Sequence, residues 1–128
     1  MKEDSTNMTL VIDNQTANFD DATLPFEHAF HITNNHLEQG MNATLILLDE
    51  AQMFITNNQL RQKPKPTDVL SIALEDDIGE VYICPNYVFS QGHDPERIIH
   101  LWVHGLLHTA GYTHDDDNDF LIMRTKES

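Results

Sequence analysis

Three histidines near the C-terminal end, His104, His108 and His114, place the strongest constraint on the fold of this chain. They follow the apolar run at 98–103, which is typical of a core helix. His104 and His108 are four residues apart, so both imidazoles can project from one helix face toward one metal ion. Gly111 can end the helix in the left-handed conformation, and the chain can then turn back to bring His114 to the same ion. The pattern predicts a three-histidine metal site at the end of a core helix.

Three neutral imidazoles with one open coordination position are typical of a catalytic zinc site. We therefore expect one Zn²⁺ ion, although nickel or copper would accept the same ligands in vitro. His100 lies four residues before His104, but a helix separates it from His108 by about 12 Å, too far for one ion to bind both easily. We interpret His100 as a structural or edge residue. The plainer alternative is a buried apolar helix with incidental histidines.

The residue after the first histidine bears on the chemistry. Zinc peptidases of the His-Glu-x-x-His kind place a glutamate there as general base, whereas this chain has Gly105. The longer peptidase spacing is otherwise reproduced by the three histidines. A zinc hydrolase acting on another ester or amide therefore stays open as an alternative, but the missing carboxylate disfavours peptide hydrolysis.

The length of 128 residues and the hydrophobic fraction of 40% predict a single domain over residues 1–128, with residues 1–7 flexible. Residues 1–4 lack the basic-then-apolar pattern of a secretory signal, and the apolar stretches are too short to cross a bilayer. The single cysteine, Cys84, excludes an internal disulfide and suits a reducing compartment. Its place at the end of a predicted strand indicates a buried side chain rather than a nucleophile. We expect a cytoplasmic protein without a membrane partner.

The net charge of −14 argues against broad, nonspecific binding to nucleic acids, and no DNA is expected as a partner. The seven Lys and Arg residues are unevenly placed, because three of them fall within five positions: Arg61, Lys63 and Lys65. Such a cluster of positive charge permits a local contact with a phosphate without nonspecific binding along a nucleic acid. A solvated loop is the plainer interpretation.

The apolar pattern along the chain predicts alternating strands and helices. Strands are expected at 9–12, 43–48, 67–74 and 80–84, and helices at 24–37, 49–60, 85–91 and from 94 onward. The segment at 62–66, Gln-Lys-Pro-Lys-Pro, predicts an extended connector. Together these elements predict a small α+β domain, with helices packed on a roughly four-stranded mixed sheet.

Aspartates stand where three of the helices are expected to begin. Asp49 with Gln52 is typical of a capping box, and Asp94 followed by Pro95 is typical of a helix start. The three aspartates at 115–117 either cap a final short helix or hold a ligand imidazole by its other nitrogen.

Separated segments resemble one family, the YbeY-type endoribonucleases, also called rRNA maturation factors. Residues 104–114, His-Gly-Leu-Leu-His-Thr-Ala-Gly-Tyr-Thr-His, are similar to the family's His-Gly-x-Leu-His-x-x-Gly-Tyr-Asp-His. Residues 57–61, Asn-Asn-Gln-Leu-Arg, are similar to Asn-x-x-Tyr-Arg, and residues 65–71 contain the Thr-Asp-Val-Leu-Ser of the family. Residues 79–83, Gly-Glu-Val-Tyr-Ile, are similar to the strand that follows. Departures from the family pattern occur at Leu60, Ile72, Ala73, Glu80 and Thr113.

The resemblance implies a zinc-dependent, single-strand-specific endoribonuclease, a hydrolase of phosphodiester bonds. It implies a role in rRNA maturation at the 3′ end of 16S rRNA and in ribosome quality control. Arg61 and His104 are then the expected catalytic residues, with Arg61 stabilising phosphate charge in the transition state. The plainer role for Arg61 is a surface ion pair. Attack by hydroxide and attack by the 2′-hydroxyl of the RNA both remain open.

The expected partners are single-stranded RNA and rRNA. Because the net negative charge slows approach to RNA, a ribosomal protein or an assembly GTPase is a candidate carrier. A further alternative is a non-catalytic ribosome-assembly factor whose metal mainly stabilises the fold.

Overall fold

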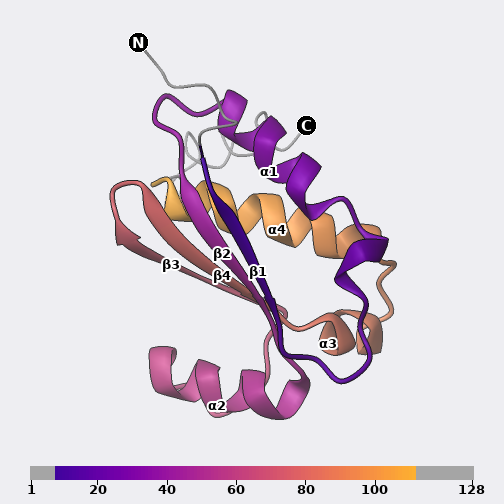
Figure 1. Cartoon of the computed structure of the whole chain (residues 1–128). Helices are drawn as coiled ribbons and strands as arrows, with labels where there is room; N and C mark the ends of the chain where they lie inside the picture. The colour runs from indigo at the N-terminus through magenta and orange to yellow at the C-terminus, as the bar shows by residue number, and fades with distance from the viewer. Residues whose placement is uncertain (1–7, 112–128) are drawn as a thin grey trace.

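The computed structural model describes residues 8–111, and the predictions for residues 1–7, for His114 and for a final helix after 115 lie outside the described residues (Figure 1). The described elements follow in the order β1 (Leu10–Asn14), a 3-10 turn (Asp21–Thr23), α1 (Phe26–Asn35), β2 (Asn42–Leu47), α2 (Glu50–Arg61), β3 (Val69–Glu75), β4 (Ile78–Ile83), α3 (Pro85–Ser90) and α4 (Glu96–Thr109). Each predicted strand and helix within this range is present, with bounds shifted by a few residues. Within residues 8–111, no helix is both long and apolar enough to cross a membrane.

The four strands form one mixed sheet in the order β1-β2-β4-β3. β1 pairs with β2 and β2 with β4 in parallel, whereas β3 and β4 form an antiparallel hairpin. The hairpin turns at residues 76–77, as the Asp-Asp-Ile-Gly segment predicts. The α+β architecture with a four-stranded mixed sheet is therefore confirmed.

The main core lies between the sheet and the helices α1 and α4. Alternate residues of the two central strands are fully buried there, as expected for strands with one face on a core. Trp102 of α4 lies at the centre of this core, and its Nε1 donates to the backbone oxygen of Phe26 at 2.9 Å. The ring of Trp102 meets Phe26 edge-on and stacks on Phe30. These contacts join α1 to α4 over one face of the sheet.

The other face of the sheet carries a smaller apolar cluster. Met53 is the fully buried apolar residue of α2 and packs there with Ile46, Leu48, Leu70 and Cys84. α2 consequently sits beyond one end of the sheet, separate from α1 and α4 (Figure 1). This placement matters for the site because Arg61 is the last residue of α2.

The capping box predicted at Asp49 is wrong. Asp49 does precede α2, but its side chain makes no cap hydrogen bond. Instead its Oδ2 accepts from the backbone N–H of Ala17 at 3.0 Å, and its Oδ1 accepts from Nδ2 of Asn86 at 3.2 Å. The carboxylate thus joins segments that are distant in sequence. The reciprocal bonds of a capping box between Asp49 and Gln52 are therefore not formed by the Asp49 side chain.

The start predicted for the histidine helix is also off by one residue. Pro95 takes the cap position and α4 begins at Glu96, without a cap bond from a side chain. Asp94 contributes its backbone oxygen, which accepts from the N–H of Arg97 at 3.0 Å. The backbone therefore satisfies a donor that the Asp94 side chain was expected to bind.

Candidate active site

His104 and His108 lie one turn apart near the C-terminal end of α4 and face each other. Their Nε2 atoms are 2.9 Å apart and their ring centroids 4.5 Å. Two zinc ligands at the usual Zn–N distance of about 2.0–2.1 Å hold their nitrogens about 3.3–3.4 Å apart, so a small ring rotation would suffice. The same nitrogens can share one hydrogen bond when one of them carries a proton. The pair fits the predicted role as two ligands of one ion.

The third predicted ligand, His114, lies outside the described residues. α4 ends at Thr109, and Gly111 has a φ of 102°, so the left-handed turn predicted there is confirmed. Within residues 8–111, no three His, Cys, Asp or Glu side chains gather as a metal site. The histidine pair and the turn after it suit a three-ligand site, and its completion by His114 stays a prediction.

Gly105, between the two histidines, faces the sheet. A Cβ at Gly105 would lie 2.6 Å from Cγ1 of Val81 in β4, closer than non-bonded carbon atoms approach each other in proteins. A second close approach follows one turn later, because a Cβ on Gly79 would lie 2.6 Å from Cβ of Thr109. Glycine at 105 is therefore a packing requirement. A glutamate there would have to enter the core, so in this packing position 105 cannot carry the general base of zinc peptidases.

Arg61 lines the same cavity as the histidine pair, although 43 positions separate it from His104 in the sequence. A cavity of about 330 Å³ is lined by residues of α2, β3 and α4: Arg61, Val69, Leu70, Ser71, His104 and His108. The structure thus brings three of the four predicted site residues to one cavity. This arrangement places a guanidinium beside a candidate metal position, which suits the binding of an anionic ligand.

The connector after Arg61 is held by a buried amide whose residue matches the family's Asn-x-x-Tyr-Arg segment, although the motif itself predicts no role for it. Asn57 of α2 is fully buried, and its Nδ2 donates to the backbone oxygen of Lys65 at 2.9 Å. α2 ends at Arg61, and the next residue, Gln62, caps it in the left-handed conformation with φ of 54°. Asn57 therefore fixes the path of the predicted extended connector against α2, and with it the end of the helix that carries Arg61.

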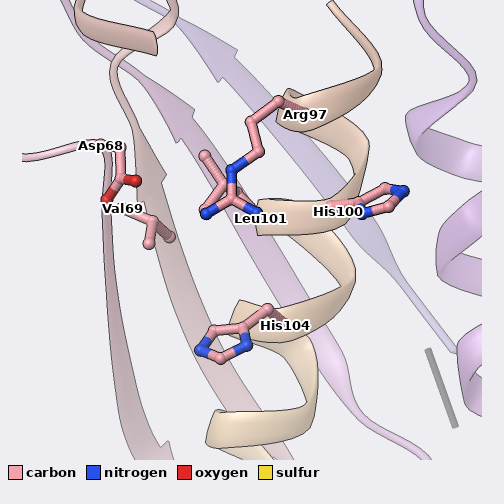
Figure 2. Close-up of a pocket in the computed structure, with 6 residues that line it drawn as sticks. All are labelled: Asp68, Val69, Arg97, His100, Leu101 and His104. Carbon is pink, nitrogen blue, oxygen red and sulfur yellow. The ribbon is translucent and has the colours of Figure 1, made fainter. Parts of the chain in front are cut away.

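A second cavity adjoins His104 on its other side. It measures about 230 Å³ and is lined by Asp68, Val69, Arg97, His100, Leu101 and His104. Figure 2 shows Arg97 and His104 extending from α4 toward Asp68 and Val69, whereas the ring of His100 points away from them. Sequence reasoning missed Arg97. Its spacing of seven residues from His104, two helical turns on one face, was the available signal.

Cys84 lies outside this site. It is fully buried in the cluster on the opposite face of the sheet. Burial raises the pKa of its thiol from 9.0 to about 11, so the nucleophilic thiolate is disfavoured at neutral pH. The predicted buried, unreactive role is in agreement with this environment.

Comparison with known proteins finds relatives along nearly the whole chain. The family profile described as "Endoribonuclease YbeY" matches residues 11–128. A protein of that name from Neisseria gonorrhoeae is 34% identical over 136 residues, covering 86% of this chain and 78% of the relative. One from Neisseria meningitidis is 38% identical over 100 residues, covering 66% of this chain. This chain spans only 58% of the length of that meningococcal relative.

A solved structure supports the fold independently. The solution structure of a protein from Thermotoga maritima superposes with a TM-score of 0.65, covering 93% of this chain and 87% of the other. Because the two sequences are only 23% identical, this likeness concerns the fold alone. The match of the family profile over residues 11–128 and the identity to relatives carry the assignment. The chain belongs to the YbeY endoribonuclease family.

Proposed function

We propose that this protein is a metal-dependent endoribonuclease that cleaves single-stranded RNA. The observation that carries the proposal is the single cavity shared by Arg61, His104 and His108. A cation on one wall and two converging imidazoles on another suit the recognition of a phosphodiester. The curated relatives are named as endoribonucleases, which makes RNA the expected polymer.

The proposed metal ligands are His104, His108 and His114, and the proposed ion is one Zn²⁺. The distance of 2.9 Å between Nε2 of His104 and Nε2 of His108 supports the first two. When bound, the ion would supply Lewis-acid chemistry, either by polarising a phosphoryl oxygen or by lowering the pKa of a water. Both imidazoles must be neutral to act as ligands, which places their remaining protons on Nδ1.

Arg61 is the proposed catalytic cation. Its guanidinium can donate two parallel hydrogen bonds to phosphate oxygens and is always charged. Negative charge on those oxygens is redistributed in the transition state, so a donor fixed beside them lowers the barrier. The bond from Asn57 to the backbone of Lys65 limits the movement of the segment next to Arg61 and thereby prepares this contact.

The proposed biological substrate is rRNA, with processing of the 3′ end of 16S rRNA and ribosome quality control as the processes served. These finer assignments rest on the family resemblance. A cytoplasmic location and a protein carrier, a ribosomal protein or an assembly GTPase, complete the proposal. The carrier is motivated by the net charge of −14, which slows the approach to a polyanion.

The decisive test compares RNA cleavage by the wild-type protein and by His108→Ala, purified in parallel. A 5′-labelled single-stranded RNA, its duplex and the matching single-stranded DNA are the substrates, and zinc content is measured on the same samples. We expect cleavage of the single-stranded RNA alone, lost together with the metal in His108→Ala. Equal cleavage by both proteins would point to a contaminating nuclease and remove the proposal.

A further inference from the structure

We propose that Arg97 binds a second phosphate of the RNA strand, next to the one held at Arg61. This inference rests on the proposed function, because it extends the same site along the substrate. The strand would pass along α4, with His104 between two arginine-bound phosphates. The substrate class that fits is therefore an oligonucleotide with at least one phosphate beyond the scissile linkage.

The first support is the continuity of the two cavities. His104 and Val69 line both of them, so the cavity of Arg61 and the cavity of Arg97 meet at these residues. Arg97 precedes His104 by two helical turns, about 10 Å along the axis of α4. Figure 2 shows both side chains on the same side of α4. The two arginines thus line two adjoining cavities that share His104.

The second support is the distribution of positive charge. The sequence contains 21 Asp and Glu residues but only seven Lys and Arg residues. Within residues 8–111 the cations are Arg61, Lys63, Lys65 and Arg97. Arg61 and Arg97 line the two cavities, and both lysines belong to the connector that follows Arg61. In a strongly acidic protein, two arginines in adjoining cavities make these cavities the place where a polyanion is repelled least, whereas the two lysines line neither cavity.

The third support is that the guanidinium of Arg97 keeps its donors available. Arg97 is exposed, and no ion pair between residues of the described range joins it to a carboxylate. Asp68 stands on the opposite wall of the cavity (Figure 2). A carboxylate repels phosphate and accepts hydrogen bonds. The phosphate is consequently directed to the α4 wall of the cavity.

The test measures binding of a fluorescent single-stranded RNA to the full chain at several salt concentrations. Its 2′-O-methyl sugars block attack by the 2′-hydroxyl, and gel electrophoresis after each titration checks that the strand is intact. For Arg97→Gln we expect binding to weaken about 10-fold at low salt, as for a lost charge-assisted contact. The slope of log K against log salt should fall by about 0.7, the value for one phosphate of a single strand. Arg97→Lys should restore most of the slope but only part of the affinity, because a lysine cannot bind bidentately.

Lys63→Gln is the matched control, since it removes the same charge from an exposed residue that lines neither cavity. A second control replaces one phosphate beside the scissile linkage with an uncharged methylphosphonate. On the oligonucleotide whose neutral linkage faces Arg97, Arg97→Gln should cause no additional loss. This comparison also tells whether the second phosphate lies on the 5′ or the 3′ side.

The outcomes separate this inference from the proposed function. Unchanged affinity and slope in Arg97→Gln would overturn the second phosphate site, and so would a wild-type protein that does not bind the oligonucleotide. If the wild type cleaves RNA and Arg97→Gln cleaves and binds equally well, only the inference fails. If the salt slope falls as expected in Arg97→Gln but the wild type never cleaves RNA, the nuclease proposal fails and the phosphate site stands.

Discussion

Gly105 of α4 rests directly on Val81 of β4, so closely that a Cβ at position 105 would lie 2.6 Å from Cγ1 of Val81. This contact sets the distance between the helix and the sheet at the point where the two histidines leave the helix. Because His104 and His108 flank the contact, their positions relative to β3 depend on it.

The glycine contact predicts a specific compensation. Gly105→Ala should destabilise the protein by about 1–3 kcal/mol, because the added methyl group overpacks the core by more than helix propensity returns. Val81→Ala also destabilises it, since it removes buried methyl groups. The double variant should be more stable than the sum of the two changes predicts, as measured by urea unfolding. Strict additivity would show that the close approach does not govern this interface.

Arg61 is expected to act on the reaction rather than on the metal. Arg61→Ala should lower RNA cleavage about 10²-fold or more, the usual effect of losing one transition-state donor. Arg61→Lys should recover a minor part, because it keeps the charge without the bidentate geometry. Zinc content, measured by elemental analysis, should equal that of the wild type in both variants. Full activity in Arg61→Ala would exclude the arginine from the mechanism.

Asn57 is expected to position Arg61 through the connector. Asn57→Ala should lower the free energy of unfolding by about 1 kcal/mol, because the backbone oxygen of Lys65 loses its donor, whereas the Oδ1 atom that is also removed is buried without a partner among the described residues. It should also lower kcat more than it raises KM. The informative control is the same change in an Arg61→Ala background. There it should still destabilise the protein but reduce cleavage no further, whereas a plain stability effect would reduce cleavage in both backgrounds.

Metal removal should lower stability without unfolding the chain. The two larger apolar clusters contain neither His104 nor His108 and are built on Trp102, Leu45 and Met53, which are fully buried. Zinc at 100 to 1,000 times its Kd should stabilise the holo protein by about 3–4 kcal/mol. Calorimetry with and without a chelator should show a cooperative transition in both samples, at a lower Tm in the chelated one. An unfolded chelated protein would favour the alternative that the metal mainly stabilises the fold.

Burial of the Cys84 thiol makes a contribution to the free energy of unfolding that is lost at alkaline pH. Its thiol has a pKa of about 11 in the folded protein against an ordinary 9.0, because burial disfavours the thiolate. The folded state therefore holds this proton more tightly than the unfolded state does. The contribution is complete below about pH 9 and disappears as the pH rises through about 11. The free energy of unfolding of the wild type should fall more steeply over this window than that of Cys84→Ala.

A chemical measurement on the same cysteine serves as the control. Iodoacetamide at pH 8 should modify Cys84 quickly in urea and slowly in the folded protein, as followed by mass spectrometry. Cys84→Ala should also cleave RNA like the wild type. Rapid modification of the folded protein, or parallel pH curves for both proteins, would contradict the buried environment.

Features that depend on neighbouring residues in the sequence were predictable. The meeting of His104 and His108 needs only a helix, because residues four apart share a face wherever a helix forms. The left-handed turn at Gly111 and the hairpin turn at 76–77 likewise follow from local backbone preferences. The mixed sheet followed from the order and the lengths of the apolar runs.

The error at Asp49 arose because donors that are distant in the sequence bind its side chain. Asp49 has the sequence context of a cap, but Ala17 and Asn86 supply the donors that its carboxylate accepts from. These donors come from segments that only folding brings together. Local propensity could not anticipate them, because a carboxylate bonds whichever donors the packed chain presents to it.

The sequence by itself determined the histidine pair, the turn that follows it and the class of the fold, since each depends on intrinsic backbone geometry. Only the tertiary structure decided that Arg61 and Arg97 each line a cavity with His104. That arrangement requires α4 to lie against β4 at Gly105 and α2 to be held at the end of the sheet by Met53. Long-range packing sets the placement of α4 and of α2, because a close-packed interior allows only one separation between neighbouring elements. The spacing of residues along the chain does not encode that separation.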